Sequence, residues 1–211
     1  MHHLLVWVEG DGDQAAAPLL LKKLLKRAQR FDWNVPQPIK VGEMPKLRKV
    51  LPKRAAEVGI KARAGVCHAV LVLLDLDDAQ ACPVTEAQGL ATTLATYRLP
   101  VPVAVVLARR EYEEWLVASL PTIAPHTPLL PDSLRRDYPA EGKRDVKGWL
   151  QTHMEVAYKP PLHQPEFTRH LDPALASAEC RSFRRLETAL AWLLTLAAAP
   201  PATQQGAVSP H

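Results

Sequence analysis

Ala69-Val70-Leu71-Val72-Leu73-Leu74-Asp75-Leu76-Asp77 is the stretch of sequence that decides the fold. Its first six residues are all apolar, which is typical of a central strand in a parallel sheet that is buried on both faces. The run then ends at the acidic residues Asp75 and Asp77. It is also far shorter than the ~20 apolar residues of a membrane span. The stretch therefore predicts a buried strand with an acidic carboxyl end.

Strand-like and helix-like segments alternate on both sides of this stretch. Before it we expect a strand over 4–8, a helix over 14–30, a short strand near 39–41, and a helix over 46–61 that is interrupted or restarted at Pro52. After it we expect a helix over 85–97, a second buried strand over 101–107, and a helix entered through 108–116. Such alternation predicts an α/β fold with a mostly parallel central sheet flanked by helices.

Beyond Ser119 the pattern changes to Pro-rich loops and further helices, near 143–154, 164–171 and 182–197. We therefore divide the chain into an α/β core over residues 1–120 and a mainly helical extension over 121–199 that packs on it. Residues 200–211 are rich in Pro, Ala, Gln and Ser, and we expect a flexible tail there.

The formal net charge of +4 is unevenly distributed along the 211 residues. Residues 1–66 hold 13 Lys and Arg against 6 Asp and Glu, whereas the remainder holds 13 against 16. A basic first third beside an acidic cluster suits a protein that attracts phosphates, although two solvated helix faces would give the same counts. The first residues show no signal-peptide pattern and no segment is long enough to span a membrane. We expect a cytoplasmic protein without a membrane partner.

Acidic residues follow three of the expected strands directly. Glu9 ends the first strand, Asp75 and Asp77 end the central one, and Glu111 and Glu113 follow the next. Because the carboxyl ends of parallel strands meet at one edge of a sheet, we expect these side chains to converge. Two like charges ~4 Å apart repel by about 4 kcal/mol at an effective dielectric constant near 20. A cluster of this kind needs cations or bound protons.

Mg²⁺ and Mn²⁺ prefer such oxygen ligands, and a pair of these ions can catalyse phosphodiester hydrolysis. Without a metal, the same clustering would raise a carboxylate pKa and create an acid–base group. Each motif also has a structural alternative. Asp13 can cap a helix, Asp75 and Asp77 can form a polar strand exit, and residues 111–114 can complement a helix dipole.

Other chemistries lack their motifs. The three cysteines, Cys67, Cys82 and Cys180, form no CxxC pair, and we expect free buried thiols. The histidines show neither HxxxH nor HExxH spacing, and no serine lies in a nucleophile-elbow motif. The Gly10-x-Gly12 pair lacks the third glycine of a dinucleotide-binding fingerprint.

The acidic motifs resemble those of a known superfamily. Val8-Glu9-Gly10 followed by Leu74-Asp75-Leu76-Asp77 resembles the Toprim domain of topoisomerases, bacterial primases and nucleases of the overcoming-lysogenization-defect (OLD) type. Further segments are similar to an uncharacterised bacterial Toprim-like family, the domain of unknown function family 4276. These segments are Arg110-Glu111-Tyr112-Glu113-Glu114-Trp115-Leu116, Gly142-Lys143-Arg144 with Lys147, and Ser182-Phe183-Arg184-Arg185-Leu186.

The resemblance, which covers most of residues 4–196, implies a Rossmann-like Toprim fold with a helical C-terminal extension. It implies Glu9 as a catalytic acid or base, Asp75 and Asp77 as ligands of Mg²⁺ or Mn²⁺, and Glu111 and Glu113 as a second metal position. Catalysis would fall to Glu9, Asp75, Asp77 and Glu111. We expect neither topoisomerase nor primase activity, because these 211 residues offer no second domain for a topoisomerase tyrosine and no zinc module of the primase kind.

The remaining expectation is a metal-dependent nuclease that hydrolyses phosphodiester bonds of DNA or RNA, in bacterial antiphage defence or repair. The alternative is a non-catalytic Toprim-like binding or sensor subunit that partners an ATPase. A small-ester phosphatase ranks last, because its nucleophile and histidine motifs are absent. The residues that we expect along the nucleic-acid backbone are Lys22, Lys23, Lys26, Lys46, Arg48, Lys49, Lys143 and Lys147.

Overall fold

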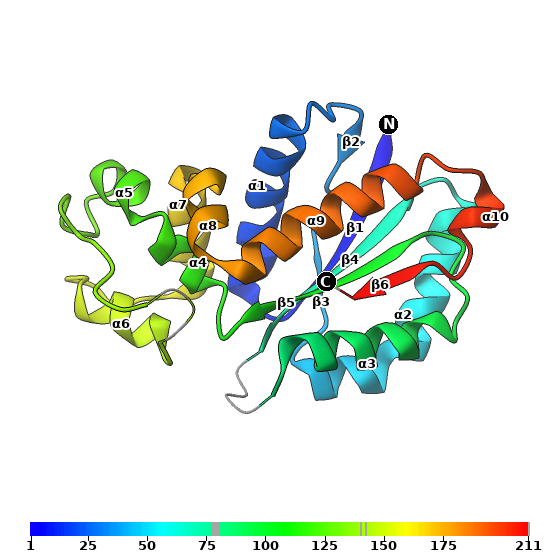
Figure 1. The fold of residues 1–211 in the computed structure, drawn as a ribbon, viewed down its shortest axis with the longest axis horizontal. Coiled ribbons are helices and arrows are strands. Elements are labelled where there is room, and N and C mark those ends of the chain that lie inside the picture. The colour runs from blue at the N-terminus through cyan, green and yellow to red at the C-terminus, as the bar shows by residue number, and fades with distance from the viewer. Residues whose placement is uncertain (77–80, 140, 142, 211) are drawn as a thin grey trace.

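A six-stranded sheet forms the centre of the computed structural model, which describes residues 1–76, 81–139, 141 and 143–210 (Figure 1). The strands run in the order β2-β1-β4-β5-β6, and β3 pairs with the second half of β1. Every pairing among the described strands is parallel. The strands are β1 (His2–Val8), β2 (Trp33–Asn34), β3 (Ile39–Lys40), β4 (Ala69–Leu76), β5 (Val103–Arg109) and β6 (Val208–Pro210).

Helices cover both faces of this sheet. In Figure 1, α1 (Asp11–Arg27) and α9 (Arg181–Leu196) lie above it, and α2 (Met44–Arg63) and α3 (Pro83–Ala95) lie below it. The central strand β4 divides its side chains between the two layers. Leu71 and Leu73 pack in the hydrophobic core with α1 and α9, whereas Val70, Val72 and Leu74 pack in the other core. The uninterrupted apolar run thus reflects a strand that is buried on both faces.

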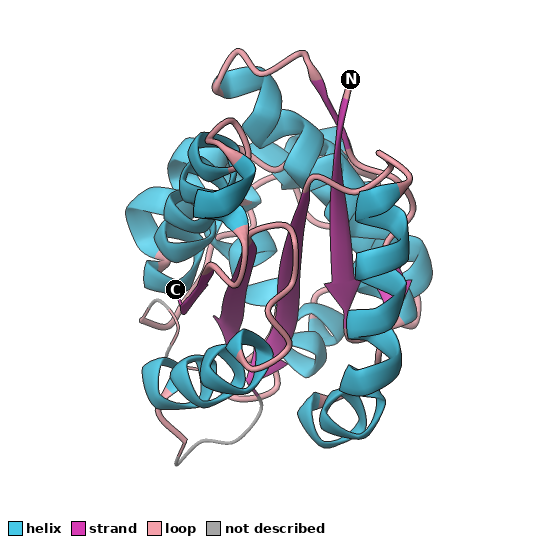
Figure 2. Ribbon diagram, turned by 90° about the vertical axis from the view of Figure 1, so that its right-hand side faces the viewer, coloured by secondary structure: helices cyan, strands magenta, loops and turns pink. Residues whose placement is uncertain are grey.

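The helices between β5 and α9 gather in a lobe at the end of the sheet where β1, β4 and β5 terminate, and Figure 2 shows the strand arrowheads pointing to the same edge. Helix α7 packs along α1, and this contact joins the lobe to the sheet. Among the described helices, none is both long and apolar enough to cross a membrane. The lobe contains α4 (Glu113–Ala118), α5 (Leu120–Ile123), a 3₁₀ helix (Ala124–His126), α6 (Val146–Thr152), α7 (Pro160–His170) and α8 (Pro173–Glu179).

The α/β class, the mostly parallel sheet and the C-terminal helices are confirmed. The expected interruption at Pro52 is wrong, because α2 continues through it from Met44 to Arg63. Proline removes a backbone donor from the helix interior. Here, however, the buried stripe of Leu47, Leu51, Ala55 and Val58 continues on both sides of Pro52, and its packing holds the helix together.

The last described residues, in the stretch for which we expect a flexible tail, form a short helix and a short strand. A short helix, α10 (Pro201–Gln204), leads to Gly206, which takes a left-handed φ of 72°. The chain then enters β6, in which Val208 pairs with Val103 of β5. Val208 packs against the hydrophobic core of α2 and α3. The strand therefore covers the edge that β5 would otherwise expose.

Candidate functional site

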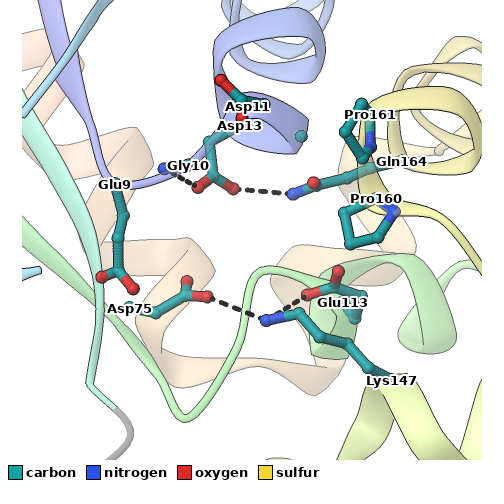
Figure 3. A pocket seen from close by; sticks show the side chains of 11 residues that line it. Glu9, Gly10, Asp11, Asp13, Asp75, Glu113, Lys147, Pro160, Pro161 and Gln164 are labelled. Carbon is teal, nitrogen blue, oxygen red and sulfur yellow. Dashed lines mark hydrogen bonds and ion pairs between the residues drawn. The ribbon is translucent and has the colours of Figure 1, made fainter. Parts of the chain in front are cut away.

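Glu9 and Asp75 leave neighbouring strands at the same edge of the sheet. Because Val8 of β1 is in register with Leu73 of β4, the two acidic residues that follow emerge side by side. Figure 3 shows the two side chains next to each other, with the Asp75 carboxylate directed toward Lys147. The Asp75 side chain is only 9% exposed, and its Oδ1 accepts a hydrogen bond from the backbone N–H of Tyr112 at 3.0 Å. Asp77 lies outside the described residues.

Glu111 and Glu113 reach this edge through the turn after β5. Arg110 adopts a left-handed φ of 73°, and this turn brings the chain into α4. The Glu113 side chain is fully buried, and its Oε1 accepts a hydrogen bond from the Tyr158 hydroxyl at 3.0 Å. Its Oε2 is also buried and accepts no hydrogen bond from any described residue. Glu113 thus carries a buried carboxylate oxygen without a donor.

Lys147, in the first turn of α6, lies among three of these carboxylates. Its ammonium nitrogen is 3.6 Å from Asp75 Oδ2, 3.6 Å from Glu111 Oε1 and 3.7 Å from Glu113 Oε2. Its backbone N–H also donates to Glu111 Oε2 at 3.0 Å. We expected this lysine on a nucleic-acid backbone, whereas the structure places it inside the acidic site. Its side chain remains 37% exposed.

Asp13 forms the opposite wall of the site. Its Oδ2 accepts a hydrogen bond from the Gly10 N–H at 3.0 Å, so it caps the start of α1 from inside the first turn. Its Oδ1 accepts a second bond from Gln164 Nε2 of α7 at 2.7 Å (Figure 3). A Cβ atom on Gly12 would lie 1.9 Å from Gln164 Oε1 and 2.8 Å from Pro160 Cβ. The absence of a side chain at Gly12 therefore allows α7 to approach α1.

Two cavities open beside the Glu9–Asp75 pair. The first, of about 270 Å³, lies between the pair and α7, and its lining includes Asp13, Glu113 and Lys147. The second, of about 370 Å³, lies toward α2 and α3. Glu9 and Asp75 line both cavities. A ligand in either cavity would thus contact this pair.

The electrostatics show a shortage of positive charge. Burial raises the pKa of Asp75 well above its ordinary value; Asp13 and Glu113 add to this effect, and Lys147 opposes it. Burial also raises the pKa of Glu113 to about 7, again against the influence of Lys147. The pKa of Asp13 is raised by burial, and its bond from Gln164 counteracts the shift. An additional cation would relieve this strain between like charges.

The chemistry of the donor set suits a hard divalent cation, since it consists of carboxylate oxygens and includes the donor-less Oε2 of Glu113. Within the described part of the chain, however, no three His, Cys, Asp or Glu side chains are already arranged as metal ligands. Asp75, Glu111 and Glu113 instead surround the Lys147 ammonium. Metal binding here would require that ammonium to move.

Glu114 does not belong to the site, although the same sequence motif contains it. Its carboxylate is buried and bonded to Arg136 at 3.1 Å, to the Tyr138 hydroxyl at 3.0 Å and to the Glu141 N–H at 2.9 Å. These contacts hold Arg136, Tyr138 and Glu141 against α4. Glu114 is thus a structural residue.

Two of the basic residues that we expected on nucleic acid make structural contacts instead. Lys23 donates to the carbonyl oxygens of Arg169 and Leu171 at 2.6 and 2.9 Å, and so binds the C-terminal end of α7. The Lys143 ammonium lies 5.1 Å from the centre of the Tyr138 ring, within cation–π distance.

The other expected basic residues lie on helix surfaces. Arg48 lines the larger cavity and pairs with Glu86 at 3.6 Å. Lys46 pairs with Glu43 at 3.3 Å. The exposed remainder is Lys22, Lys26 and Lys49. Arg48 is thus the member of this group that lies beside the Glu9–Asp75 pair.

The sequence analysis missed the residues that the helical lobe brings to the site. Tyr158, Pro160 and Gln164 come from the start of α7 and the loop before it, and their residue types carry no sequence signal for an acidic site. The cysteine prediction is partly wrong. Cys67 and Cys180 are free and buried as expected, whereas Cys82 is exposed because it lies just outside the first turn of α3.

Comparison with known proteins gives one finding. Neither a curated protein nor a solved structure matches the chain significantly. The domain of unknown function DUF4276 matches residues 8–191, a span that contains Glu9, Asp75, Glu111, Glu113 and Lys147. The match covers most of the chain and confirms the family that the motifs indicate. The chain therefore belongs to the DUF4276 family.

Proposed function

We propose that the protein is a Toprim-like, divalent-metal-dependent nuclease that hydrolyses phosphodiester bonds of DNA or RNA. One observation carries the proposal. Buried carboxylates with too little positive charge line a cavity at the carboxyl edge of a parallel sheet. This is the position at which α/β proteins bind ligands, and carboxylates are the ligands that Mg²⁺ and Mn²⁺ prefer.

Each residue has a separate role in this proposal. Glu9, Asp75 and Glu113 would hold the metal, which when bound acidifies water and polarises a phosphate oxygen. Glu111 accepts the backbone N–H of Lys147 and so positions α6. The Lys147 ammonium balances the carboxylates without a metal, and its partly exposed side chain would turn toward a substrate phosphate when the metal binds. Tyr158 and Gln164 orient Glu113 and Asp13.

The sequence motifs support the same proposal. Glu9 before Gly10 and Asp75 in an Asp-x-Asp segment resemble the acidic motifs of Toprim nucleases. Work in bacterial defence or repair, beside an ATPase, is the biological setting that this resemblance suggests.

Cleavage of supercoiled plasmid and of a labelled single-stranded oligonucleotide in Mn²⁺ tests the proposal. We expect Asp75→Asn and Glu9→Gln to lower the rate by about 100-fold or more, the usual effect of losing a catalytic group. Asp32→Asn is the matched control, because Asp32 is 49% exposed, pairs with Arg30 just before β2, and lines neither of the two cavities. Its rate should stay within about twofold of wild type. Equal rates in all four proteins would exclude the nuclease.

A non-catalytic binding subunit is the second candidate, and the position of Lys147 favours it. An ammonium among three carboxylates takes the place that a metal would occupy in an active centre. Titration calorimetry with Mn²⁺ on the same proteins distinguishes the two. Oligonucleotide binding without Mn²⁺ uptake or cleavage would support the subunit.

A further inference from the structure

A third pocket, of about 150 Å³, lies at the same edge of the sheet and is lined by basic side chains. Its lining includes Arg109 at the end of β5 and Arg181 and Arg185 in the first turns of α9. We call these three residues with their cavity the arginine pocket. In Figure 1, α9 lies above β5 and α3 below it, so the pocket is built where three elements meet.

The arginine charges are not neutralised by the part of the chain that the structure describes. No described carboxylate lies within ion-pair distance of Arg109, Arg181 or Arg185. Glu141 also lines the pocket, but its Oε1 accepts the backbone N–H of Ser182 at 2.6 Å and the Ser182 hydroxyl. That oxygen caps α9 and leaves the guanidinium groups for a ligand.

The thiol of Cys82 lies beside the same arginines. It is exposed in the wall of the pocket, immediately before α3. Hydrogen bonds from Thr85 lower the pKa of its thiol, and the positive charge of Arg185 contributes. The thiolate of Cys82 is thus favoured here. The first turns of α3 and α9 add the partial positive charge of two helix N-termini.

We propose that the arginine pocket binds a phosphate group, and that this phosphate belongs to the nucleic-acid backbone leading into the acidic site. Arginine offers several donors in a fixed plane that matches phosphate oxygens. The volume is below the roughly 300–1,000 Å³ of a pocket for a whole small molecule. It therefore fits one phosphate with its adjoining atoms better than an entire nucleotide.

The pocket lies one short step along the sheet from the acidic site. Arg109 is in register with Leu76, the residue after Asp75, and precedes Glu111 by two positions. A chain held here would pass the edge from which Asp75 emerges. The assignment to a polymer rests on the proposed function, whereas phosphate recognition rests on the arginines alone.

Binding of inorganic phosphate to the pocket can be tested separately from the proposed nuclease activity. In EDTA, we measure the rate at which iodoacetamide alkylates Cys82, since Cys67 and Cys180 are buried. Phosphate at 10 mM should slow alkylation of the wild type several-fold relative to chloride of equal ionic strength. The protection should disappear in Arg181→Gln/Arg185→Gln. It should persist in Arg63→Gln/Arg98→Gln, a matched control that removes two exposed arginines before β4 and β5. Equal protection of Cys82 in both double variants would show that the arginine pocket does not bind phosphate.

Fluorescence anisotropy with a labelled single-stranded 12-mer, also in EDTA, tests whether the bound phosphate belongs to a nucleic-acid backbone. We expect Arg181→Gln/Arg185→Gln to bind about tenfold more weakly and the slope of its salt dependence to become shallower by about 0.7, the change for one lost phosphate contact on a single strand. The control should match the wild type. If phosphate protects Cys82 but the double variant binds the oligonucleotide as tightly as wild type does, the pocket binds free phosphate and the assignment to a nucleic-acid backbone is wrong. If oligonucleotide binding depends on the arginine pocket but the protein does not cleave nucleic acid in Mn²⁺, this inference stands and the nuclease proposal is rejected.

Discussion

The ammonium of Lys147 lies 3.6 Å from Oδ2 of Asp75, so a residue of the helical lobe neutralises the carboxylate that ends the central strand. Lys147 also lies near Glu111 and Glu113, and its removal would leave partly buried carboxylates with less compensation. This relationship makes Lys147 a test of both the stability and the metal chemistry of the site.

Lys147→Met should lower the free energy of unfolding by about 1–2 kcal/mol at pH 8 in EDTA, less than for a fully buried pair because the lysine is partly exposed. Mn²⁺ should bind about tenfold more tightly than to wild type, because no ammonium competes for the oxygens. Urea unfolding and calorimetry measure the two effects, with the exposed Lys22→Met as control. Unchanged Mn²⁺ affinity would mean that no metal enters between these carboxylates.

The raised pKa of Glu113, about 7 against an ordinary value of 4.5, should make stability depend on pH. Between these two values the folded protein binds a proton that the unfolded chain has lost, so stability falls as pH rises through this window. Glu113→Gln should flatten urea-derived stability between pH 4.5 and 7.5. The raised pKa of Asp75 acts in the same direction, so part of the slope should remain. A variant slope equal to that of wild type would contradict the burial of Glu113 as a titrating acid.

Tyr158→Phe removes the hydroxyl that donates to Glu113 Oε1. Because this oxygen is buried, we expect a loss of about 1–3 kcal/mol above pH 7 and a smaller loss at pH 5, where Glu113 is protonated. The hydroxyl of Tyr97 makes no hydrogen bond to a described residue, so Tyr97→Phe is the control and should stay within ~0.5 kcal/mol. Chemical denaturation at the two pH values provides the comparison. A loss independent of pH would disconnect Tyr158 from the Glu113 charge.

Gly12→Ala and Gly89→Ala should change stability in opposite directions, although both glycines lie in helices. At Gly12 the new methyl group would collide with Pro160 and displace Gln164 from Asp13, which should cost about 2 kcal/mol. At Gly89 the nearest atom is 3.9 Å away, and alanine should stabilise α3 by about 0.5–1 kcal/mol. Thermal unfolding of both proteins measures the difference. Stabilisation by both substitutions would disprove the close contact between α1 and α7.

Local sequence patterns were sufficient to predict most of the sheet. The apolar run of β4 and the acidic residues after β1, β4 and β5 follow from periodicity and from the rule that parallel strands end at one edge. The edge strand β6 escaped prediction, because a Pro-rich ending resembles a tail and a three-residue strand has too few residues to show alternation. The continuity of α2 through Pro52 depends on tertiary packing, which overrides local propensity.

The partner of the acidic residues could not be predicted from pattern alone. Lys147 follows Glu111 by 36 positions across Pro-rich loops, and its basic motif is equally compatible with an exposed helix face. Asp13 was identified as a helix cap, which it is, but its second bond to Gln164 spans 151 positions. Contacts at such separations depend on how the lobe packs against the sheet, and neither spacing nor composition encodes that packing.

The parallel pairing of β1 with β4 also affects the order in which parts of the protein can fold during synthesis. These two strands can pair only after the chain between them has been synthesised, and closing such long loops slows folding. During synthesis, Glu9 and Asp75 leave the ribosome well before Lys147. A nascent chain that begins to assemble this edge must therefore tolerate mutual repulsion of its carboxylates until α6 emerges. Ambient Mg²⁺ would provide temporary compensation, and we expect refolding in EDTA to be slower at this step.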